Sequence, residues 1–554
     1  MTRGLKVFSH QHKALAATLA LLFTGCAMEP VTTDRSGPLV PRYLESARAA
    51  GLVHTYTADT DFVVGGGAAA FDCDQDGDLD IALAGGLAPL SLFLNMSTAG
   101  SATRFEAEPT LGIMLGERSR RATGVHAIDI DNDAQVDLVV TRFGRNLVLR
   151  NRGGCRFDDV TKIWGLDGTG TWTTVFAASW IGNQRHPTLI FGNYVRRDRR
   201  LAKRGNCEPS VIMRPGVPAS DGSPRYAVPR QIVPSYCPLS MRYIDWRNTG
   251  ESDLWISNDR QYADPEGAEQ LLSIGTTSMR QLTDADGWKT HKIWGMGLAA
   301  ADVDGDGYLE VVATSMAENQ FFALTDPGTG RPSFVNQAWR RGTASQRPYT
   351  GGDPRPSTSW HAEFADVNND GRDDLLIVKG NVDRMETFAQ FDPDSLLLGR
   401  GDGSFEEVGG DTGIALDRAG RGAAVFDADG DGCLDIVVVN RNQPVSFLRA
   451  VNCAALPGSV GLVLTQDGVN RFAIGARVIA DSSGGHIDRQ VSVGGGHAGN
   501  SLTPFRFGTG AAGRARVRVR WPDGVISASV PVKAGYLYRW DRASPSPTVV
   551  RTSQ

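Results

Sequence analysis

The chain has 554 residues, of which 21% are charged and 41% are hydrophobic, and its formal net charge at pH 7 is −5. No cluster of basic and aromatic residues stands out, so the sequence gives no indication of nucleic-acid binding. Residues 1–25 are too short and wrongly flanked for a membrane span, and beyond them no segment stays apolar for about 18 residues, which argues against a membrane-spanning helix. We therefore expect a soluble folded body.

Residues 1–25 have the pattern of a secretory signal peptide, because basic residues precede an apolar run from Ala14 to Phe23. Cys26 follows a small residue and resembles the cysteine of a bacterial lipobox, so we expect a lipid anchor there, followed by a tether over 26–42. By resemblance to known lipoproteins, Ala27 rather than aspartate after Cys26 favours an outer-membrane lipoprotein of the bacterial cell envelope. Phe23 is atypical of a lipobox and leaves ordinary signal-peptide cleavage as the alternative.

Five short acidic stretches follow one template, and a run of β-forming residues comes directly after each. Carboxylate or amide oxygens stand at positions 1, 3, 5 and 9, with Gly or Ala at position 6, which is the ligand spacing of a Ca²⁺ loop. We predict about five Ca²⁺ sites; Mg²⁺ suits them less because it keeps its waters. The predicted metal ligands are Asp72, Asp74, Asp76 and Asp80; Asp129, Asp131, Asp133 and Asp137; Asp302, Asp304, Asp306 and Glu310; Asp366, Asn368, Asp370 and Asp374; and Asp427, Asp429, Asp431 and Asp435.

The spacing of these loops indicates a repeat protein. The loops recur about every 60 residues, except for a gap about three times as long between Asp129 and Asp302. Two decayed copies fit into this gap, one at residues 243–253 and one near 176–195. The segments after the loops lack a 3.6-residue period, which argues against EF-hands. A repeat of this length suits four short strands, so we predict an all-β fold with a seven-bladed β-propeller over residues 43–455.

The order of segments within the repeat predicts how the ring closes. Residues 43–56 read like the end of a repeat, yet they precede the first loop, and the last repeat lacks this phrase. We therefore predict that the N-terminal strand completes the last blade, which would protect two sheet edges. Small residues before the loops, as in Gly67–Ala70 and Gly297–Ala300, should allow close approach near the axis. Residues 196–242 are rich in proline and are expected to form a long insertion.

After Cys453 the sequence changes character. Residues 456–541 lack acidic loops and alternate instead, as in Val517–Trp521, which predicts a small antiparallel β domain. Residues 542–554 are rich in Ser, Pro and Thr and are expected to be a flexible tail. Apart from Cys26 the cysteines are even in number, which favours disulfides in an exported chain. The pairs favoured by their nearness in sequence are Cys433 with Cys453 and Cys207 with Cys237; the pairing of Cys73 and Cys155 stays open.

The acidic loops resemble FG-GAP/VCBS repeats of integrin-like propellers, and the last section is similar to the ASPIC/UnbV domain of the cartilage-acidic-protein-1-like family. The second resemblance is carried by Ala473–Val478, Gly494–Gly496, Phe505–Gly510 and Trp521–Gly524. The chain departs from the family pattern at His497–Asn500 and at Thr509. The resemblance implies a secreted calcium-binding propeller with a C-terminal β domain, here as a bacterial lipoprotein, and it implies no known reaction.

These features predict a non-catalytic binding or scaffold protein, a monomer that presents loops to an unknown protein or glycan. We find no nucleophile elbow, P-loop or dinucleotide-binding fingerprint. The alternative is an enzyme or natural-product pathway accessory that uses the propeller funnel, where His291, Trp360 and His361 precede two of the loops. A third hypothesis is an adhesin that acts through Arg400–Asp402.

Overall fold

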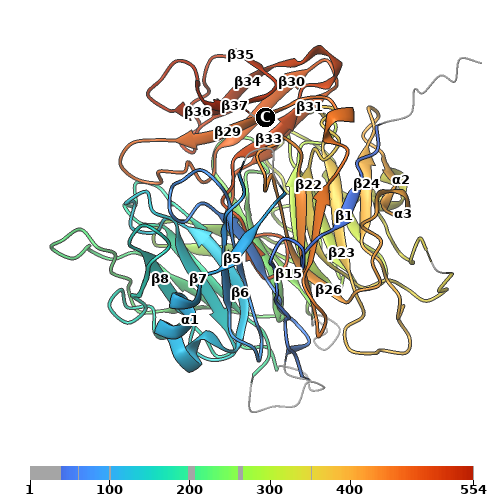
Figure 1. Ribbon diagram of the computed structural model, residues 1–554. Coiled ribbons are helices and arrows are strands. Elements are labelled where there is room, and N and C mark those ends of the chain that lie inside the picture. The colour runs from blue at the N-terminus through green and yellow to red at the C-terminus, as the bar shows by residue number, and fades with distance from the viewer. Residues whose placement is uncertain are drawn as a thin grey trace, which may run out of the picture. The chain divides into compact units, whose positions relative to one another are not determined.

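The computed structural model describes residues 39–59, 62–98, 102–196, 206–259, 266–350 and 352–552. The predicted signal peptide, Cys26 and most of the predicted tether lie outside these residues. Strands far outnumber helices in the described chain, which confirms the predicted all-β class (Figure 1). In this part of the chain no helix is both long enough and apolar enough to cross a membrane.

Between residues 43 and 450, the described strands form seven four-stranded antiparallel sheets, and β32 (Gly499–Asn500) joins one of them in parallel. In chain order these are β2 (Ala68–Phe71), β3 (Asp80–Leu83), β4 (Ser91–Asn95) and β5 (Phe105–Ala107); β6 (Ala122–Ile128), β7 (Asp137–Arg142), β8 (Leu147–Asn151) and β9 (Phe157–Asp159); β10 (Thr173–Ser179), β11 (Thr188–Asn193), β12 (Ser210–Met213) and β13 (Arg230–Ile232); β14 (Pro238–Ile244), β15 (Asp253–Asn258), β16 (Gln270–Ile274) and β17 (Met279–Gln281); β18 (Gly295–Ala301), β19 (Glu310–Ser315), β20 (Gln320–Leu324) and β21 (Phe334–Asn336); β22 (Ser359–Ala365), β23 (Asp374–Lys379), β24 (Ser395–Gly399) and β25 (Phe405–Glu407); and β26 (Gly420–Phe426), β27 (Asp435–Asn440), β28 (Ser446–Ala450) and β1 (Tyr43–Glu45).

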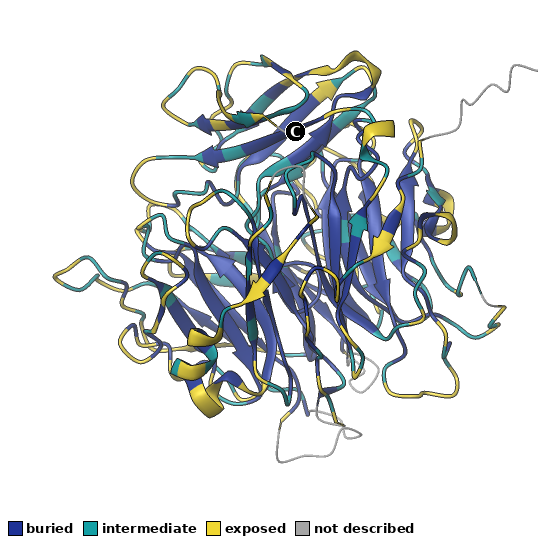
Figure 2. Ribbon diagram, viewed as in Figure 1, coloured by how far each residue is buried: buried dark blue, intermediate teal, exposed yellow. Residues whose placement is uncertain are grey.

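The first long strand of each sheet lies at the centre of the propeller. These inner strands, β2, β6, β10, β14, β18, β22 and β26, contact one another in this order, and β26 contacts β2 again. Most of their residues are small or apolar, and almost all are buried, as Figure 2 shows for the interior. Strands that are covered on both faces favour such continuous apolar sequences.

The two ends of the propeller meet in one sheet. β1 pairs antiparallel with β28, with Tyr43 opposite Ala450 and Glu45 opposite Leu448. The prediction that the N-terminal strand completes the last sheet is confirmed. The pairing covers the outer edge of β28, which would otherwise offer unpaired backbone groups to other chains.

The structure differs from the sequence-based expectation for residues 196–242. This segment is not a mere excursion, because it supplies β12 and β13 and the start of β14. Its prolines lie mostly in the connections, where a missing N–H costs nothing. The disulfide Cys207–Cys237 joins two parts of the segment, with a Cα–Cα distance of 4.9 Å.

The structure also contains the other two disulfides. Cys433 is bonded to Cys453, as predicted, and the leftover pair Cys73 and Cys155 is bonded as well. The Cys73–Cys155 disulfide joins the first and second sheets, because Cys73 follows β2 and Cys155 precedes β9.

The C-terminal domain is built from two sheets. One contains β29 (Ser459–Thr465), β33 (Phe505–Gly508), β36 (Tyr536–Asp541) and β37 (Thr548–Thr552), and the other contains β30 (Arg477–Ser482), β31 (His486–Gln490), β34 (Arg514–Arg520) and β35 (Val530–Lys533). Apolar residues of both sheets, including Trp521 and Trp540, form a shared core. The domain is not purely antiparallel as predicted, because β29 and β36 run parallel; a pair so distant in sequence has no hairpin to fix its direction.

The expected flexible tail contains a strand instead. β37 pairs with β36, and its Val549 and Val550 favour the extended conformation in spite of the polar residues before them. The remaining elements are short helices: α1 (Pro109–Leu115), η2 (Gly116–Ser119), α2 (Ala338–Arg341), α3 (Gly409–Thr412), η4 (Cys453–Ala455) and η5 (Gly510–Ala512).

Candidate functional site

Each of the five acidic loops connects the first strand of a sheet to the second. The carboxylate at position 9 is in every case the first residue of the second strand, for example Asp80 in β3 and Glu310 in β19. Position 6 lies in the left-handed region, with a φ of 90° at Gly77, where glycine is favoured. Ala134 takes this position in the second loop, with a φ of 68°.

Backbone N–H groups hold the carboxylates at positions 1 and 9. In the first loop, Gly77 N–H donates to Asp72 Oδ2 at 3.1 Å, and Cys73 N–H donates to Asp80 Oδ2 at 2.9 Å. Asn95 N–H, at the end of the third strand, donates to Asp80 Oδ1 at 2.9 Å. The first two hydrogen bonds recur in the other four loops. The backbone thus fixes the orientation of both carboxylates.

The oxygens held in this way lie close together. Asp72, Asp74 and Asp80 each place one oxygen within 4.8 Å of the others, and Asp129, Asp131 and Asp137 do the same. Burial, and to a smaller extent the charges of Asp74 and Asp72, raises the pKa of Asp80 to about 7. Such crowding disfavours the charged carboxylates unless a cation lies between them.

The donor set fits a hard divalent cation. Asp131 Oδ1 and Asp429 Oδ1 are both buried, and neither accepts a hydrogen bond from any described residue. A buried carboxylate oxygen without a partner is costly, and a metal ion would remove that cost. Both residues occupy position 3 of their loops, where the calcium template requires a ligand.

The loops differ in how far arginines already balance their charge. Among the described residues, no basic side chain pairs with the four predicted ligands of the first loop; Arg551 contacts Asp78, which is not a ligand, at 2.7 Å between Nη1 and Oδ1. In the second loop, by contrast, Arg150 Nε lies 2.6 Å from Asp131 Oδ2. The other ion pairs to predicted ligands are Arg150–Asp133, Arg341–Asp304, Arg372–Asp370 and Arg506–Asp427, and His486 Nε2 lies 3.9 Å from Asp302 Oδ2. The first loop therefore has the most unbalanced negative charge.

The decayed copies lack a calcium template in the structure as well. In the copy at residues 243–253, position 3 is Arg247, which pairs with Asp253 at position 9. In the other copy, the residues that connect β10 and β11 contain no carboxylate. We do not place a cation at either copy.

The C-terminal domain lies directly on the acidic-loop end of the propeller (Figure 1). Gly508 N–H donates to Asp366 Oδ2 at 2.7 Å, and Asn470 N–H donates to Asn132 Oδ1 at 2.6 Å. Arg477 Nη1 donates at 3.0 Å to Gly307 O, within the third acidic loop. The loops predicted to bind Ca²⁺ are thus also the docking surface of the second domain.

One segment of the C-terminal domain enters the centre of the propeller. We call residues 493–502 the axial segment. It contacts inner strands on all sides: Gly495 N–H donates to Met241 O of β14, Gly496 N–H donates to Leu298 O of β18, and Leu502 N–H donates to Ala70 O of β2. Its residues Gly499–Asn500 form β32, which pairs parallel with β6. Val493 bridges to β10, His497 contacts β22, and β32 contacts β26.

Glycines on the inner strands make room for the axial segment. A Cβ atom at Gly67 would lie 1.7 Å from Ala498 O, and one at Gly124 would lie 2.2 Å from the same oxygen. The small residues that precede the acidic loops are therefore explained by close approach at the axis, as predicted. The group they approach belongs to the C-terminal domain, which the sequence alone did not reveal.

The three residues proposed for an enzymatic funnel do not form one cluster. His361 Nδ1 accepts the N–H of His497 at 3.1 Å, and the Trp360 ring packs at a tilt against the His497 ring, with centroids 5.1 Å apart. His291 lies elsewhere, against Trp288 and Phe322 in an aromatic cluster. His361 and Trp360 therefore hold the axial segment, whereas His291 packs in the connection between β17 and β18.

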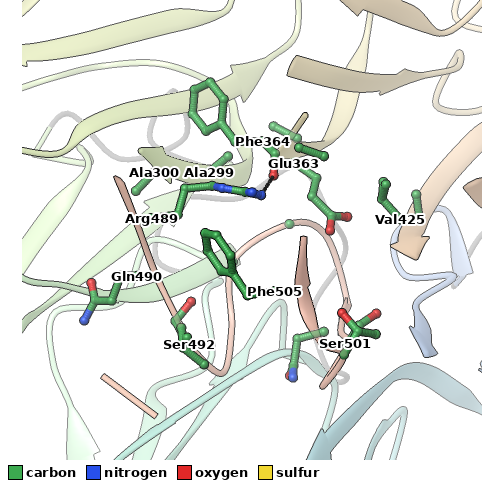
Figure 3. A pocket seen from close by; sticks show the side chains of 18 of the residues that line it. Ala299, Ala300, Glu363, Phe364, Val425, Arg489, Gln490, Ser492, Ser501 and Phe505 are labelled. Atoms are coloured by element: carbon green, nitrogen blue, oxygen red, sulfur yellow. Dashed lines mark hydrogen bonds between the residues drawn. The ribbon is translucent and has the colours of Figure 1, made fainter. Parts of the chain in front are cut away.

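A cavity of about 190 Å³ remains between the axial segment and the inner strands (Figure 3). Glu363, Arg489 and Phe505 line it. Arg489 Nη1 donates to Phe364 O at 2.8 Å, and Glu363 Oε2 lies 3.2 Å from His361 Nε2. The cavity is smaller than the roughly 300 Å³ at which small-molecule sites begin.

The motif Arg400–Asp402 forms the turn between β24 and β25. Arg400 Nη2 pairs with Glu406 Oε2 at 2.6 Å, and Asp402 Oδ1 accepts the N–H of Ser404 at 3.0 Å. Both charged side chains are thus engaged within their own hairpin.

Comparison with known proteins agrees with this architecture. Residues 466–545 match the family described as "ASPIC and UnbV". Residues 72–140 match "FG-GAP-like repeat", and residues 294–334 match "FG-GAP repeat". The chain therefore carries FG-GAP repeats followed by an ASPIC/UnbV domain, as the resemblance implied. The axial segment lies within the ASPIC/UnbV match.

Similarity to characterised proteins extends over most of the chain. Cartilage acidic protein 1 of Mus musculus is 25% identical over 497 residues, which cover 84% of this chain and 71% of that protein. The Homo sapiens protein is also 25% identical, over 84% of this chain and 70% of its own length. Among solved structures, BBS1N in complex with ARL6DN aligns with a TM-score of 0.40 and 9% identity, over 75% of this chain and 98% of that chain.

Proposed function

We propose that this protein is an exported, non-catalytic binding or scaffold protein whose propeller is stabilised by Ca²⁺. An FG-GAP propeller joined to an ASPIC/UnbV domain supports a binding or scaffold role. The signal-like sequence of residues 1–25 and three disulfides support export, since disulfides persist in oxidising compartments. We further propose a lipid anchor on Cys26 and a location at the bacterial cell envelope.

The observation that carries the calcium proposal is the arrangement of the first loop. Four carboxylates without a basic partner among the described residues are held at the edge of a sheet, where the backbone already orients two of them. When bound, Ca²⁺ would neutralise these side chains. Asp72, Asp74, Asp76 and Asp80 would hold it.

The observation that favours a binding protein over an enzyme is the axial segment. It occupies the centre of the propeller and is hydrogen-bonded to inner strands on several sides. A funnel enzyme would need this space for its substrate. The outer loops remain available for a protein or glycan partner, and presenting such loops on a rigid scaffold is a common arrangement.

Calcium binding can be tested on the full mature chain. Elemental analysis after dialysis against Ca²⁺ should give about five ions per chain, and a chelator should lower the melting temperature because binding stabilises only the folded state. The double variant Asp72→Asn/Asp74→Asn should lose one ion, whereas Asp284→Asn/Asp417→Asn, with the same charge change at exposed sites outside the loops, should lose none. A chain that binds no Ca²⁺, and that melts alike with and without chelator, would refute the proposal.

The anchor and the binding role have separate tests. Cys26→Ala should move the protein from the membrane fraction to the soluble fraction without changing its melting temperature. Capture of envelope proteins or glycans by the immobilised chain should require Ca²⁺. Retention of the Cys26→Ala variant on membranes would argue against lipidation.

A further inference from the structure

A second hollow of the propeller lies on the face away from the acidic loops. It has a volume of about 790 Å³ and lies between the connection that enters β6 (residues 116–121), the β7–β8 turn (143–146) and the segment after β9 (159–167). The acidic loop of this sheet connects β6 to β7, so the β7–β8 turn is at the opposite end of the strands. We call this hollow the basic cleft.

The cleft has a marked excess of positive charge, although the chain as a whole is negative. Two of its cations are paired: Arg118 with Asp159, and Arg120 with Glu117 at 3.5 Å between Nε and Oε2. Among the described residues, Arg121, Arg145 and Lys162 form no ion pair, and all three are exposed. The charged residues that line the cleft are Arg118, Arg120, Arg121, Arg142, Arg145 and Lys162, against Glu117, Asp159 and Asp167.

Arg142 gives the cleft a rigid floor. Its side chain is 9% exposed, and it donates from Nε and Nη2 to Arg120 O, at 3.1 and 2.9 Å. It also donates from Nη1 to Arg145 O at 2.8 Å. One guanidinium thus ties together the two loops that carry the unpaired arginines. Burial lowers the pKa of Arg142, and the nearby charges of Arg121 and Arg118 lower it further, against the opposing charge of Asp159.

We propose that the basic cleft binds a compact anionic ligand with two or more carboxylate or phosphate groups. Arg121, Arg145 and Lys162 supply the free donors, and guanidinium groups match the geometry of both oxyanions. The volume falls within the range of small-molecule sites, about 300–1,000 Å³. The aromatic residue of the lining, Phe143, is buried, so the cleft offers no stacking surface of the kind that single-stranded nucleic acids use.

This proposal does not depend on calcium or on the lipid anchor. It would give the scaffold a ligand site at the face opposite the C-terminal domain. Because surface charges are screened by salt, binding should weaken as ionic strength rises.

Calorimetric titration of the full mature chain at low ionic strength tests the site. The probes are fructose 1,6-bisphosphate for phosphate, glucarate for carboxylate, and fructose as a neutral reference. We expect saturable binding of at least one anion, no binding of fructose, and a loss of affinity of about tenfold or more in Arg121→Ala/Arg145→Ala. Binding of fructose 1,6-bisphosphate alone would identify a phosphate ligand, and binding of glucarate alone would identify a carboxylate ligand.

Matched variants make the result decisive. Arg48→Ala/Arg514→Ala removes two exposed arginines elsewhere and should bind like the wild type. Because Arg121 has a φ of 64°, a second cleft variant, Arg145→Ala/Lys162→Ala, leaves this strained position unchanged and should also weaken binding. The proposal is overturned if the wild type binds neither anion saturably, or if the cleft variants bind as tightly as the control.

Discussion

Arg247 Nη2 lies 2.6 Å from Asp253 Oδ2, and both residues belong to the same decayed loop. Trp246 Nε1 donates to the same oxygen at 2.8 Å. The loop has an arginine at position 3, where the intact copies have a carboxylate or an amide. This repeat therefore supplies its own cation, and it keeps the backbone turn in which Gly250 N–H donates to Asp245 Oδ2.

Removal of this internal cation should destabilise the protein. Arg247→Ala would leave the buried carboxylate of Asp253 without its ionic partner, at a cost of about 1.5–3 kcal/mol. Urea denaturation would measure the change. Arg280→Ala breaks an exposed pair with Asp286 and should cost less than about 1 kcal/mol. Equal effects of the two substitutions would contradict the structural role of Arg247.

The axial segment should respond to a single added methyl group. Gly67→Ala would bring a Cβ within 1.7 Å of Ala498 O, so the segment or β2 must shift, at a cost of about 1–3 kcal/mol. Limited proteolysis should then cut near Ala498 sooner than in the wild type. Gly112→Ala in α1, where an added Cβ meets nothing within 4 Å, should leave both stability and proteolysis of this region unchanged or slightly improved. Unaltered cleavage of Gly67→Ala would argue against tight insertion.

The three disulfides should contribute unequally to stability. Cys73–Cys155 closes a loop with a sequence separation of 82, and Cys433–Cys453 one of 20. On chain entropy alone, loss of the first should cost about 1 kcal/mol more than loss of the second. Paired Cys→Ser variants, compared by denaturant unfolding, would measure this difference. The reverse order would show that native contacts rather than loop length dominate.

Glu269 should give the protein a pH-dependent stability. Burial raises the pKa of this side chain from the ordinary 4.5 to about 8, against hydrogen bonds from Asn258 N–H and Trp255 Nε1. The folded state holds the proton of Glu269 more tightly than the unfolded state does. The contribution of this proton to the free energy of unfolding is therefore complete below pH 4.5 and is lost as the pH rises through 8, by at most about 1.4 kcal/mol per pH unit.

The variant Glu269→Gln resembles the protonated side chain and cannot titrate. Its unfolding free energy, measured between pH 5 and 8 in constant Ca²⁺, should therefore vary less with pH than that of the wild type. Parallel profiles for the two proteins would mean that Glu269 does not titrate in this range.

The sequence predicted those parts of the fold that rest on local or periodic signals. The acidic template located the loops and the strands that follow them, and the phase of the repeat predicted the pairing of β1 with β28. The axial segment could not be predicted in this way, because its backbone partners lie far away in sequence, from 198 residues (Leu298 to Gly496) to 432 residues (Ala70 to Leu502), and obey no period. The one available signal was the run of small residues at Gly67–Ala70, which required an unidentified neighbour.

Two predictions that rested on amino-acid composition were wrong, because pairing with a neighbouring strand outweighed the local preference of the sequence. The proline-rich segment 196–242 contains β12 and β13, and the polar tail contains β37. In both cases a neighbouring strand offered a free edge, and backbone hydrogen bonds to that edge can be made by almost any sequence without proline at the paired N–H.

The pairing of β1 with β28 has a consequence for biosynthesis. β1 is the first strand of the propeller to be made, and its partner is made about 400 residues later. During this interval β1 has no partner strand, and the last sheet made so far has an unpaired edge. A chain that stops before residue 446 lacks β28 and therefore cannot close the ring. Translation to near completion is thus a precondition for a sealed ring, and prematurely terminated products should be prone to self-association.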